Sequence, residues 1–196
     1  MTPAASENVE YARIALDELR RVERSVSHLL RFAREEEGQR AVLHMSDIVE
    51  SALECFRERA LRLGIGIERS IDCRGTMLGD AEQLRRVVIN LVGNAMDALD
   101  GAATADPRIE LHMGENLAGS EVWLQIRDNG PGIDADALAK MWNPFFTSKL
   151  EGTGLGLAIC RKIVDGHDGS IEVASQPDAG TEFVLTFPKS VAGIDS

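Results

Sequence analysis

Cysteine and aromatic residues are scarce in this sequence of 196 residues. Its three cysteines, Cys55, Cys73 and Cys160, lie far apart and form no Cys-x-x-Cys pair. This spacing argues against a disulfide framework and a zinc site, and it favours buried free thiols in a reducing compartment. With 5% aromatic and 44% hydrophobic residues, the chain is typical of a soluble globular protein packed mainly by Leu, Ile, Val and Ala.

Positive charge and long apolar runs are also lacking. The 21 Lys and Arg residues are outnumbered by 32 Asp and Glu residues, and the net charge of −11 would repel nucleic acid because no basic cluster offsets it. The stretch lowest in charge, residues 87–95, is far shorter than the ~20 apolar residues of a membrane span. The N-terminus has no basic segment followed by an apolar one, so we expect neither a signal peptide nor a membrane segment.

A stripe of apolar residues follows the N-terminal part of the chain. Residues 7–37 contain no Gly or Pro, and apolar side chains recur there at steps of mostly three and four, which predicts one long helix. The stripe consists of Val9, Ala12, Leu16, Leu19, Val22, Val26, Leu29 and Ala33. An isolated helix cannot bury such a stripe, so it needs another helix, from this chain or from a second copy. Gly38 ends the helix and begins a hinge.

Two further helices are expected over residues 46–64 and 80–99. Asp47 and Asp80 open them, each followed three residues later by a Glu or Gln that would complete a capping box. Gly64 ends the first of the two. A last helix is expected near residues 155–164.

Alternating apolar residues predict the strands. They are expected at residues 41–45, 65–71, 108–113, 121–127, 170–174 and 181–187. Helices and strands in this order predict an α+β fold, a two-layer sandwich with helices on one face of a mixed sheet, preceded by one long N-terminal helix.

The third helix carries a polar face. Asn90, Asn94 and Asp97 lie at i, i+4 and i+7, and therefore line one side of a helix whose other side is apolar. Carboxamide oxygens suit Mg²⁺, which shares its coordination shell with water and the phosphates of a nucleotide. The alternative is an ordinary solvated face.

A second motif follows the strand at 121–127. In the run Asp128-Asn129-Gly130-Pro131-Gly132-Ile133, an acidic side chain at a strand end would accept a hydrogen bond from an exocyclic amine, and the glycines would let the backbone approach a flat ring. The same run also describes a good turn.

A third motif, Gly152-Thr153-Gly154-Leu155-Gly156-Leu157, opens the last predicted helix. Backbone N–H groups at a helix N-terminus hold phosphates well, although the motif alone would also fit a tight loop. It is neither a Walker loop nor a Rossmann motif, because no Gly-Lys-Ser/Thr is present and no strand precedes it.

Together, the three motifs and the run Asn143-Pro144-Phe145-Phe146-Thr147-Ser148-Lys149 between the last two resemble the ATP-binding catalytic domain of two-component sensor histidine kinases. Their order and spacing match the N, G1, F and G2 boxes of that family, over residues 42–188. The resemblance implies the GHKL (Bergerat) ATP-binding fold over residues 39–196. Residues 1–38, with Leu29-Leu30-Arg31-Phe32-Ala33-Arg34, resemble the second helix of the family's dimerisation and phosphoacceptor hairpin.

The resemblance implies ATP and Mg²⁺ as cofactors. Asn94 would be the Mg²⁺ ligand, with Asn90 as a second candidate, while Asn90 and Lys149 would be catalytic and Asp128 would hold the adenine amine. The implied nucleotide-binding set is Asn90, Asn94, Asp97, Asp128, Gly130, Gly132, Ile133, Lys149, Gly152, Thr153, Gly154, Leu155, Gly156 and Thr181.

The segment 143–151 resembles the lid of the family's nucleotide site. Phe145 and Phe146 would anchor it, unless they are plain core residues. We expect Lys149 to cover the phosphates and to have no protein partner, and the segment to become ordered when nucleotide binds.

No phosphoacceptor is expected in this chain. In the family, the acceptor histidine is usually followed by an acidic residue and, a few positions later, by Pro. The four histidines, His28, His44, His112 and His167, do not fit this pattern.

The function implied is transfer of the ATP γ-phosphoryl group to a histidine in two-component signalling, in a cytoplasmic protein or the cytoplasmic part of a membrane-bound kinase. Expected partners are ATP, a phosphoacceptor histidine helix, a response-regulator receiver domain and a second copy bound through the N-terminal helix, but no nucleic acid. Two alternatives stay open: a serine kinase or ATPase of the same superfamily, and a nucleotide-sensing adaptor without transferase activity.

Overall fold

The computed structural model describes residues 9, 11–13, 16, 19, 39–73, 75–149 and 152–190. The elements in chain order are β1 (Ala41–His44), α2 (Met45–Glu54), α3 (Arg57–Leu63), β2 (Gly66–Ile71), β3 (Thr76–Gly79), α4 (Ala81–Asp100), β4 (Arg108–Glu115), β5 (Glu121–Asp128), α5 (Ala135–Lys140), α6 (Gly156–Gly166), β6 (Ser170–Ser175) and β7 (Thr181–Pro188). Residues 9, 11–13, 16 and 19 are helical, and the rest of the predicted N-terminal helix lies outside the described residues.

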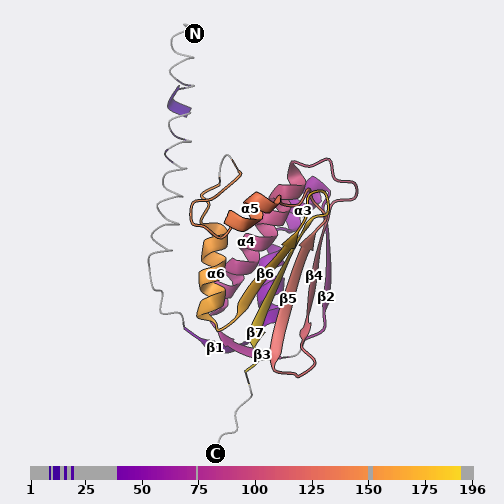
Figure 1. Ribbon diagram of the computed structural model, residues 1–196, viewed down its shortest axis with the longest axis vertical. Coiled ribbons are helices and arrows are strands. Elements are labelled where there is room, and N and C mark those ends of the chain that lie inside the picture. The colour runs from indigo at the N-terminus through magenta and orange to yellow at the C-terminus, as the bar shows by residue number, and fades with distance from the viewer. Residues whose placement is uncertain are drawn as a thin grey trace, which may run out of the picture.

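Five strands form one mixed sheet in the order β2-β4-β5-β7-β6. β2 runs parallel to β4, and the other neighbouring strands are antiparallel. β1 and β3 make a separate antiparallel pair. Figure 1 shows α4 and α6 together on one face of the five-stranded sheet, which confirms the predicted two-layer α+β architecture.

The central helix α4 positions much of the candidate site. It packs against β4 and β5 and lies between α2 and α6. As predicted, Asp80 caps it: the carboxylate accepts the N–H of Gln83 at 2.9 Å. The buried face of α4 consists of Leu84, Val87, Val88, Leu91, Val92, Ala95, Met96 and Leu99. Because this face is anchored in the core, the orientation of the opposite, polar face of α4 is fixed.

The single helix predicted over residues 46–64 is wrong, because the chain bends at Cys55-Phe56 to give α2 and α3. The bend lets the Phe56 ring pack over Gly93 of α4, where a Cβ would lie 3.7 Å from the ring. The capping box at Asp47 is also wrong. The helix begins earlier, at the buried Met45, and Glu50 pairs with Arg69 instead.

Several smaller features were not predicted or differ from expectation. The short elements β3 and α5 had no expected counterpart. Of the three free cysteines, Cys160 is buried as expected, whereas Cys55 is exposed. Within the part of the chain that the structure describes, no helix combines the length and the apolar character that a membrane crossing requires.

Candidate functional site

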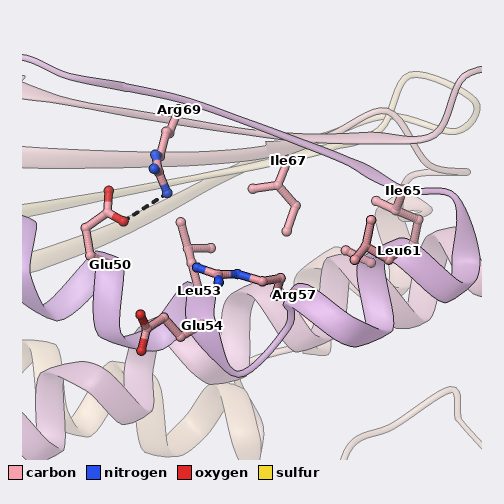
Figure 2. Close-up of a pocket in the computed structure, with 9 residues that line it drawn as sticks. Glu50, Leu53, Glu54, Arg57, Leu61, Ile65, Ile67 and Arg69 are labelled. Carbon is pink, nitrogen blue, oxygen red and sulfur yellow. Dashed lines mark hydrogen bonds and ion pairs between the residues drawn. The ribbon is translucent and has the colours of Figure 1, made fainter.

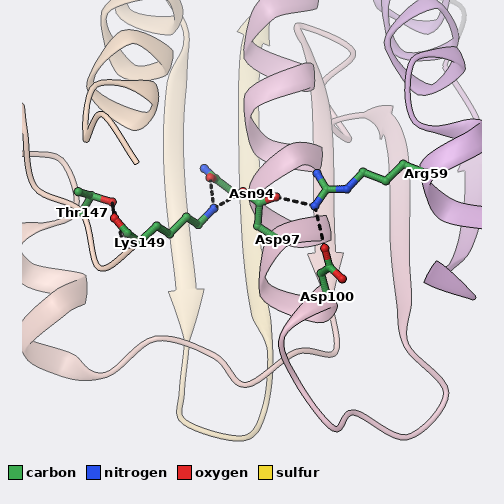
Figure 3. A network of polar contacts seen from close by, with 6 residues as sticks. All are labelled: Arg59, Asn94, Asp97, Asp100, Thr147 and Lys149. Atoms are coloured by element: carbon green, nitrogen blue, oxygen red, sulfur yellow. Dashed lines mark hydrogen bonds and ion pairs between the residues drawn. The ribbon is translucent and has the colours of Figure 1, made fainter. Parts of the chain in front are cut away.

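The polar face of α4 carries a network of polar contacts that joins α4 to α3 and to the segment before α6 (Figure 3). Lys149, from the segment before α6, places its Nζ 2.9 Å from Oδ1 of Asn94 and 2.6 Å from Oδ2 of Asp97. The expectation that Lys149 has no protein partner is therefore wrong. The two oxygens that take this ammonium are one carboxamide and one carboxylate, a donor pair that also suits Mg²⁺.

Arg59 of α3 completes the network from the other side. Its guanidinium donates to Oδ1 of Asp97 at 2.7 Å and lies 3.4 Å from Oδ2 of Asp100. Burial works to raise the pKa of Asp97, but the hydrogen bonds from Lys149 and Arg59 outweigh burial and leave that pKa below its usual value. Asp97 is therefore ionised at neutral pH. Arg59 has no signal in the sequence, because it lies 38 residues from Asp97 on a different helix.

Asn90 lies one turn before Asn94, beside the start of α6. A Cβ added to Gly156 would lie 3.3 Å from Oδ1 of Asn90. The thiol of Cys160 in α6 donates to the carbonyl of Val87 at 3.9 Å, and burial raises its pKa to about 12, while the side chain of Asn90 works to lower this pKa. The structure thus places the side chain of Asn90 next to Gly156, at the end of the glycine-rich loop.

The glycine-rich loop is packed closely onto the predicted lid. The N–H of Phe145 donates to the carbonyl of Gly154 at 2.9 Å, and a side chain at Gly154 would overlap the Phe145 backbone. Leu155 is buried, so the start of α6 is anchored. Phe146 packs against the core, whereas Phe145 is 65% exposed and adopts a left-handed backbone with φ +69°. Of the two phenylalanines, Phe146 alone anchors the segment by burial.

The second part of the site lies at the end of β5. Asp128 is 5% exposed, and its Oδ1 accepts the N–H of Gly130 at 2.9 Å. Burial raises the pKa of Asp128, and backbone hydrogen bonds from Gly130 and Thr181 offset this only in part. A carboxylate held by backbone N–H groups keeps lone pairs for an additional donor, such as an amine.

Three glycines shape the space around Asp128. Gly132 and Gly180 have φ values of +71° and +83°, and a Cβ at either position would overlap a backbone carbonyl, of Gln176 and of Asp128 respectively. A Cβ at Gly130 would lie 2.8 Å from Oδ1 of Asp128. Only glycine fits this close approach of backbone segments.

A serine that sequence analysis missed ties these loops together. Ser175 Oγ accepts the N–H of Ile133 at 2.9 Å, donates to the carbonyl of Gly180 at 2.8 Å and lies 3.1 Å from Oγ1 of Thr181. Thr181 is buried and is the register partner of both Ser175 and Asp128. The structure therefore brings Asp128, Gly130, Gly132, Ile133 and Thr181 together.

The two parts of the site meet along α4. A Cβ at Gly130 would lie 3.6 Å from that of Ala98 and 3.5 Å from a methyl group of Leu99, in the last turn of α4. Asp97 directly precedes Ala98, and Asn94 lies about one turn before it on the same helix. Asp128 and the polar face of α4 are thus neighbouring parts of one site.

Three of the four histidines lie among the described residues, two in strands and one after α6. His44 ends β1 and His112 lies in β4. His167 is buried, and both ring nitrogens are used: Nε2 accepts the N–H of Asp80 at 2.9 Å and Nδ1 donates to the carbonyl of Ile163 at 2.7 Å. His28 lies outside the described residues.

A separate pocket of about 230 Å³ lies between α2, α3 and the edge strand β2 (Figure 2). Leu53, Ile65 and Ile67 line it, and the ion pair of Glu50 with Arg69 crosses one side at 2.9 Å. The residues around this pocket include no predicted site residue, so it does not belong to the site on α4.

Comparison with known proteins decides the family. Residues 79–191 match the family described as histidine kinase-, DNA gyrase B- and HSP90-like ATPase. The chain belongs to that family. The match contains every predicted site residue, from Asn90 to Thr181. ATP is accordingly the cofactor of this type of fold.

Individual relatives include histidine kinases. The chain is 31% identical over 185 residues to the signal transduction histidine-protein kinase AtoS of Escherichia coli K12, covering 94% of this chain and 30% of AtoS. It resembles full-length ShkA in complex with AMPPNP, with a TM-score of 0.76, 26% identity and coverage of 98% of this chain and 40% of ShkA. It also resembles the histidine kinase ThkA in complex with the response regulator TrrA, with a TM-score of 0.74, 26% identity and coverage of 92% and 51%. The chain thus spans about a third of the length of AtoS.

Proposed function

We propose that this chain is the ATP-binding catalytic part of a sensor histidine kinase, which transfers the γ-phosphoryl group of ATP to a histidine. The observation that carries the proposal is the buried Asp128, held by backbone N–H groups next to the helix that carries Asn90 and Asn94. Membership of the ATPase family and similarity to AtoS support it. Residues 39–196 would form the catalytic domain, and residues 1–38 would belong to a dimerisation hairpin.

At the adenine end, Asp128 would accept a hydrogen bond from the exocyclic amine. The close packing of Gly130, Gly132 and Gly180 supports this role, because it leaves backbone rather than side chains around the carboxylate. Thr181, which is buried and hydrogen-bonded to Ser175, would line the same pocket together with Ile133.

At the phosphate end, Asn94 would hold Mg²⁺, with Asn90 as the neighbouring polar group. The ammonium of Lys149, which lies on oxygens of Asn94 and Asp97, supports this assignment, because the same oxygens suit a metal cation. Bound Mg²⁺ would offset the charge of the phosphates. Asn90 and Lys149 would orient the phosphates, and the loop of Gly152, Thr153, Gly154, Leu155 and Gly156 would present backbone N–H groups to them.

In this reaction the main task of the chain would be to position ATP. Phosphoryl transfer to an imidazole needs ATP held in line with the acceptor nitrogen and no covalent enzyme nucleophile. The acceptor would belong to a phosphoacceptor helix outside this chain, and a response-regulator receiver domain would take the phosphoryl group onward, as the ThkA–TrrA complex suggests by analogy.

The N-terminal helix supports association with a second copy. Val9, Leu16 and Leu19 are exposed by 68%, 55% and 64%, at the spacing of a helix–helix contact. Homodimerisation through this stripe would place two catalytic parts around one hairpin bundle.

Labelling with γ-labelled ATP and Mg²⁺ tests the proposal. The chain alone is expected to bind ATP without becoming labelled, and to give acid-labile, base-stable label on a supplied phosphoacceptor hairpin. Asn94→Ala is the matched negative control. Acid-stable label would indicate a serine kinase instead, and ATP binding without any transfer to several hairpins would indicate a nucleotide-sensing adaptor. Label that appears on the chain alone and vanishes in His28→Ala would mean that its helix has been misassigned.

A further inference from the structure

The polar face of α4 is occupied by a cationic side chain of the protein, the ammonium of Lys149. The Nζ atom of Lys149 contacts Asn94 and Asp97 at 2.9 and 2.6 Å, two ordinary charge-assisted distances. We propose that Lys149 and the divalent cation of the nucleotide compete for these oxygens, so that metal–nucleotide binding and detachment of Lys149 from α4 are a single exchange. This inference rests on the proposed function.

The competition follows from the space and the charge that the two cations bring to the Asn94 oxygen. Mg²⁺ binds oxygen at about 2.0–2.1 Å and requires a nearly ideal octahedral shell. An ammonium 2.9 Å from the same Asn94 oxygen occupies part of that shell and repels the metal through its like charge. Lys149 and Mg²⁺ therefore exclude each other at Asn94, whereas Lys149 and a phosphate attract each other.

Arg59 is the positioning residue of this exchange. It occupies Oδ1 of Asp97 at 2.7 Å and thereby directs Oδ2 toward Lys149. Because Arg59 also pairs with Asp100 and belongs to α3, it stays in place when Lys149 leaves. It then keeps the Asp97 carboxylate partly neutralised, which limits the affinity of the site for a metal without nucleotide.

The exchange extends to the glycine-rich loop through local hydrogen bonds. The N–H of Lys149 donates to Thr147 Oγ1 at 3.1 Å, and the N–H of Gly152 donates to the carbonyl of Lys149 at 3.2 Å. The Phe145 N–H bond to Gly154 closes the same segment. Detachment of Lys149 therefore removes a side-chain contact that holds this segment on α4, at the moment when Lys149 becomes available to phosphate.

Metal-dependent ADP binding tests the exchange. ADP affinity is measured by calorimetry with Mg²⁺ and with EDTA in the wild type, in Lys149→Met and in Lys140→Met, which removes an exposed lysine of α5 as the charge control. The gain in affinity caused by Mg²⁺ is expected to be larger in Lys149→Met than in the wild type by about 5-fold or more. Lys140→Met is expected to match the wild type.

The outcomes separate the exchange from a simple phosphate contact. If Lys149→Met changes the two ADP affinities by the same factor, Lys149 is a phosphate ligand only and the exchange is overturned, while the proposed function stands. If the wild type binds no ADP under either condition, both proposals fail.

Hydrogen exchange gives a readout that is independent of nucleotide. In nucleotide-free protein, the amides of residues 145–149 and 152–154 are expected to exchange several-fold faster in Lys149→Met and in Asp97→Asn than in the wild type, with Lys140→Met unchanged. Arg59→Met is expected to give a smaller increase. Equal exchange in the wild type and Lys149→Met would overturn the proposal.

Discussion

Asp128 and Thr181 are register partners across β5 and β7, and the backbone N–H of Thr181 works to lower the pKa of the Asp128 carboxyl, against the effect of burial. The sheet thus fixes the backbone of Asp128, and the N–H of Gly130 fixes its carboxylate at 2.9 Å. The carboxylate is therefore positioned before any ligand arrives. Its effect on nucleotide affinity and its effect on the free energy of unfolding can be measured separately.

Asp128→Asn is expected to weaken ATP and ADP binding by about 1–3 kcal/mol, because the adenine amine loses an ionised acceptor. Calorimetry measures the change, with Asp136→Asn, an exposed acid of α5, as the matched control. Unchanged affinity in Asp128→Asn would remove this carboxylate from the adenine pocket.

The same substitution is expected to raise the free energy of unfolding of nucleotide-free protein at pH 7. The pKa of Asp128 is raised in the folded state, chiefly by burial, so the folded protein holds this proton more tightly than the unfolded chain. The resulting penalty is absent below the ordinary pKa, grows as the pH rises toward the folded pKa and is complete above it. Urea unfolding of both proteins at pH 7.5 and pH 4 should therefore give a difference that shrinks at pH 4. A larger stabilisation at pH 4 would contradict this account.

Gly180→Ala is expected to destabilise the protein by about 1–3 kcal/mol and to weaken nucleotide binding, because its Cβ would overlap the Asp128 carbonyl and its φ is +83°. Gly101→Ala is the control, since that position has open space and a φ of −95°. Thermal unfolding compares the two variants. Equal melting temperatures would mean that the β6–β7 turn adapts without disturbing Asp128.

His167→Phe is expected to cost about 1–3 kcal/mol of stability, because the N–H of Asp80 and the carbonyl of Ile163 would lose their buried partner. This residue joins the start of α4 to α6, the two helices that carry the candidate phosphate site. His112→Phe, on the half-exposed side of β4, should change stability by about 0.5 kcal/mol or less. Denaturant unfolding that shows similar losses for both would argue against a special role for the His167 hydrogen bonds.

Local patterns in the sequence were enough to predict the elements whose formation depends on neighbouring residues. The apolar spacing of α4 and its Asp80 cap act within one or two turns, and both were confirmed. The glycines at 130 and 132 and the loop at 152–156 were recognised in the same way, because tight turns demand these residues wherever they occur.

Features that depend on distant partners were decided by the tertiary structure alone. β3 is four residues long and pairs with β1. In this pair Ala41 lies opposite Gly79, 38 positions later in the sequence. At the break between α2 and α3, the Phe56 ring lies over Gly93 of another helix, a contact between residues far apart in the sequence. Lys149 was expected to be without a protein partner, yet it meets Asp97 across 52 positions of sequence and shares that carboxylate with Arg59. Periodicity and capping describe only the chain's local geometry. An ion-pair network that joins α3, α4 and the segment before α6 exists only once packing has fixed the distances between them.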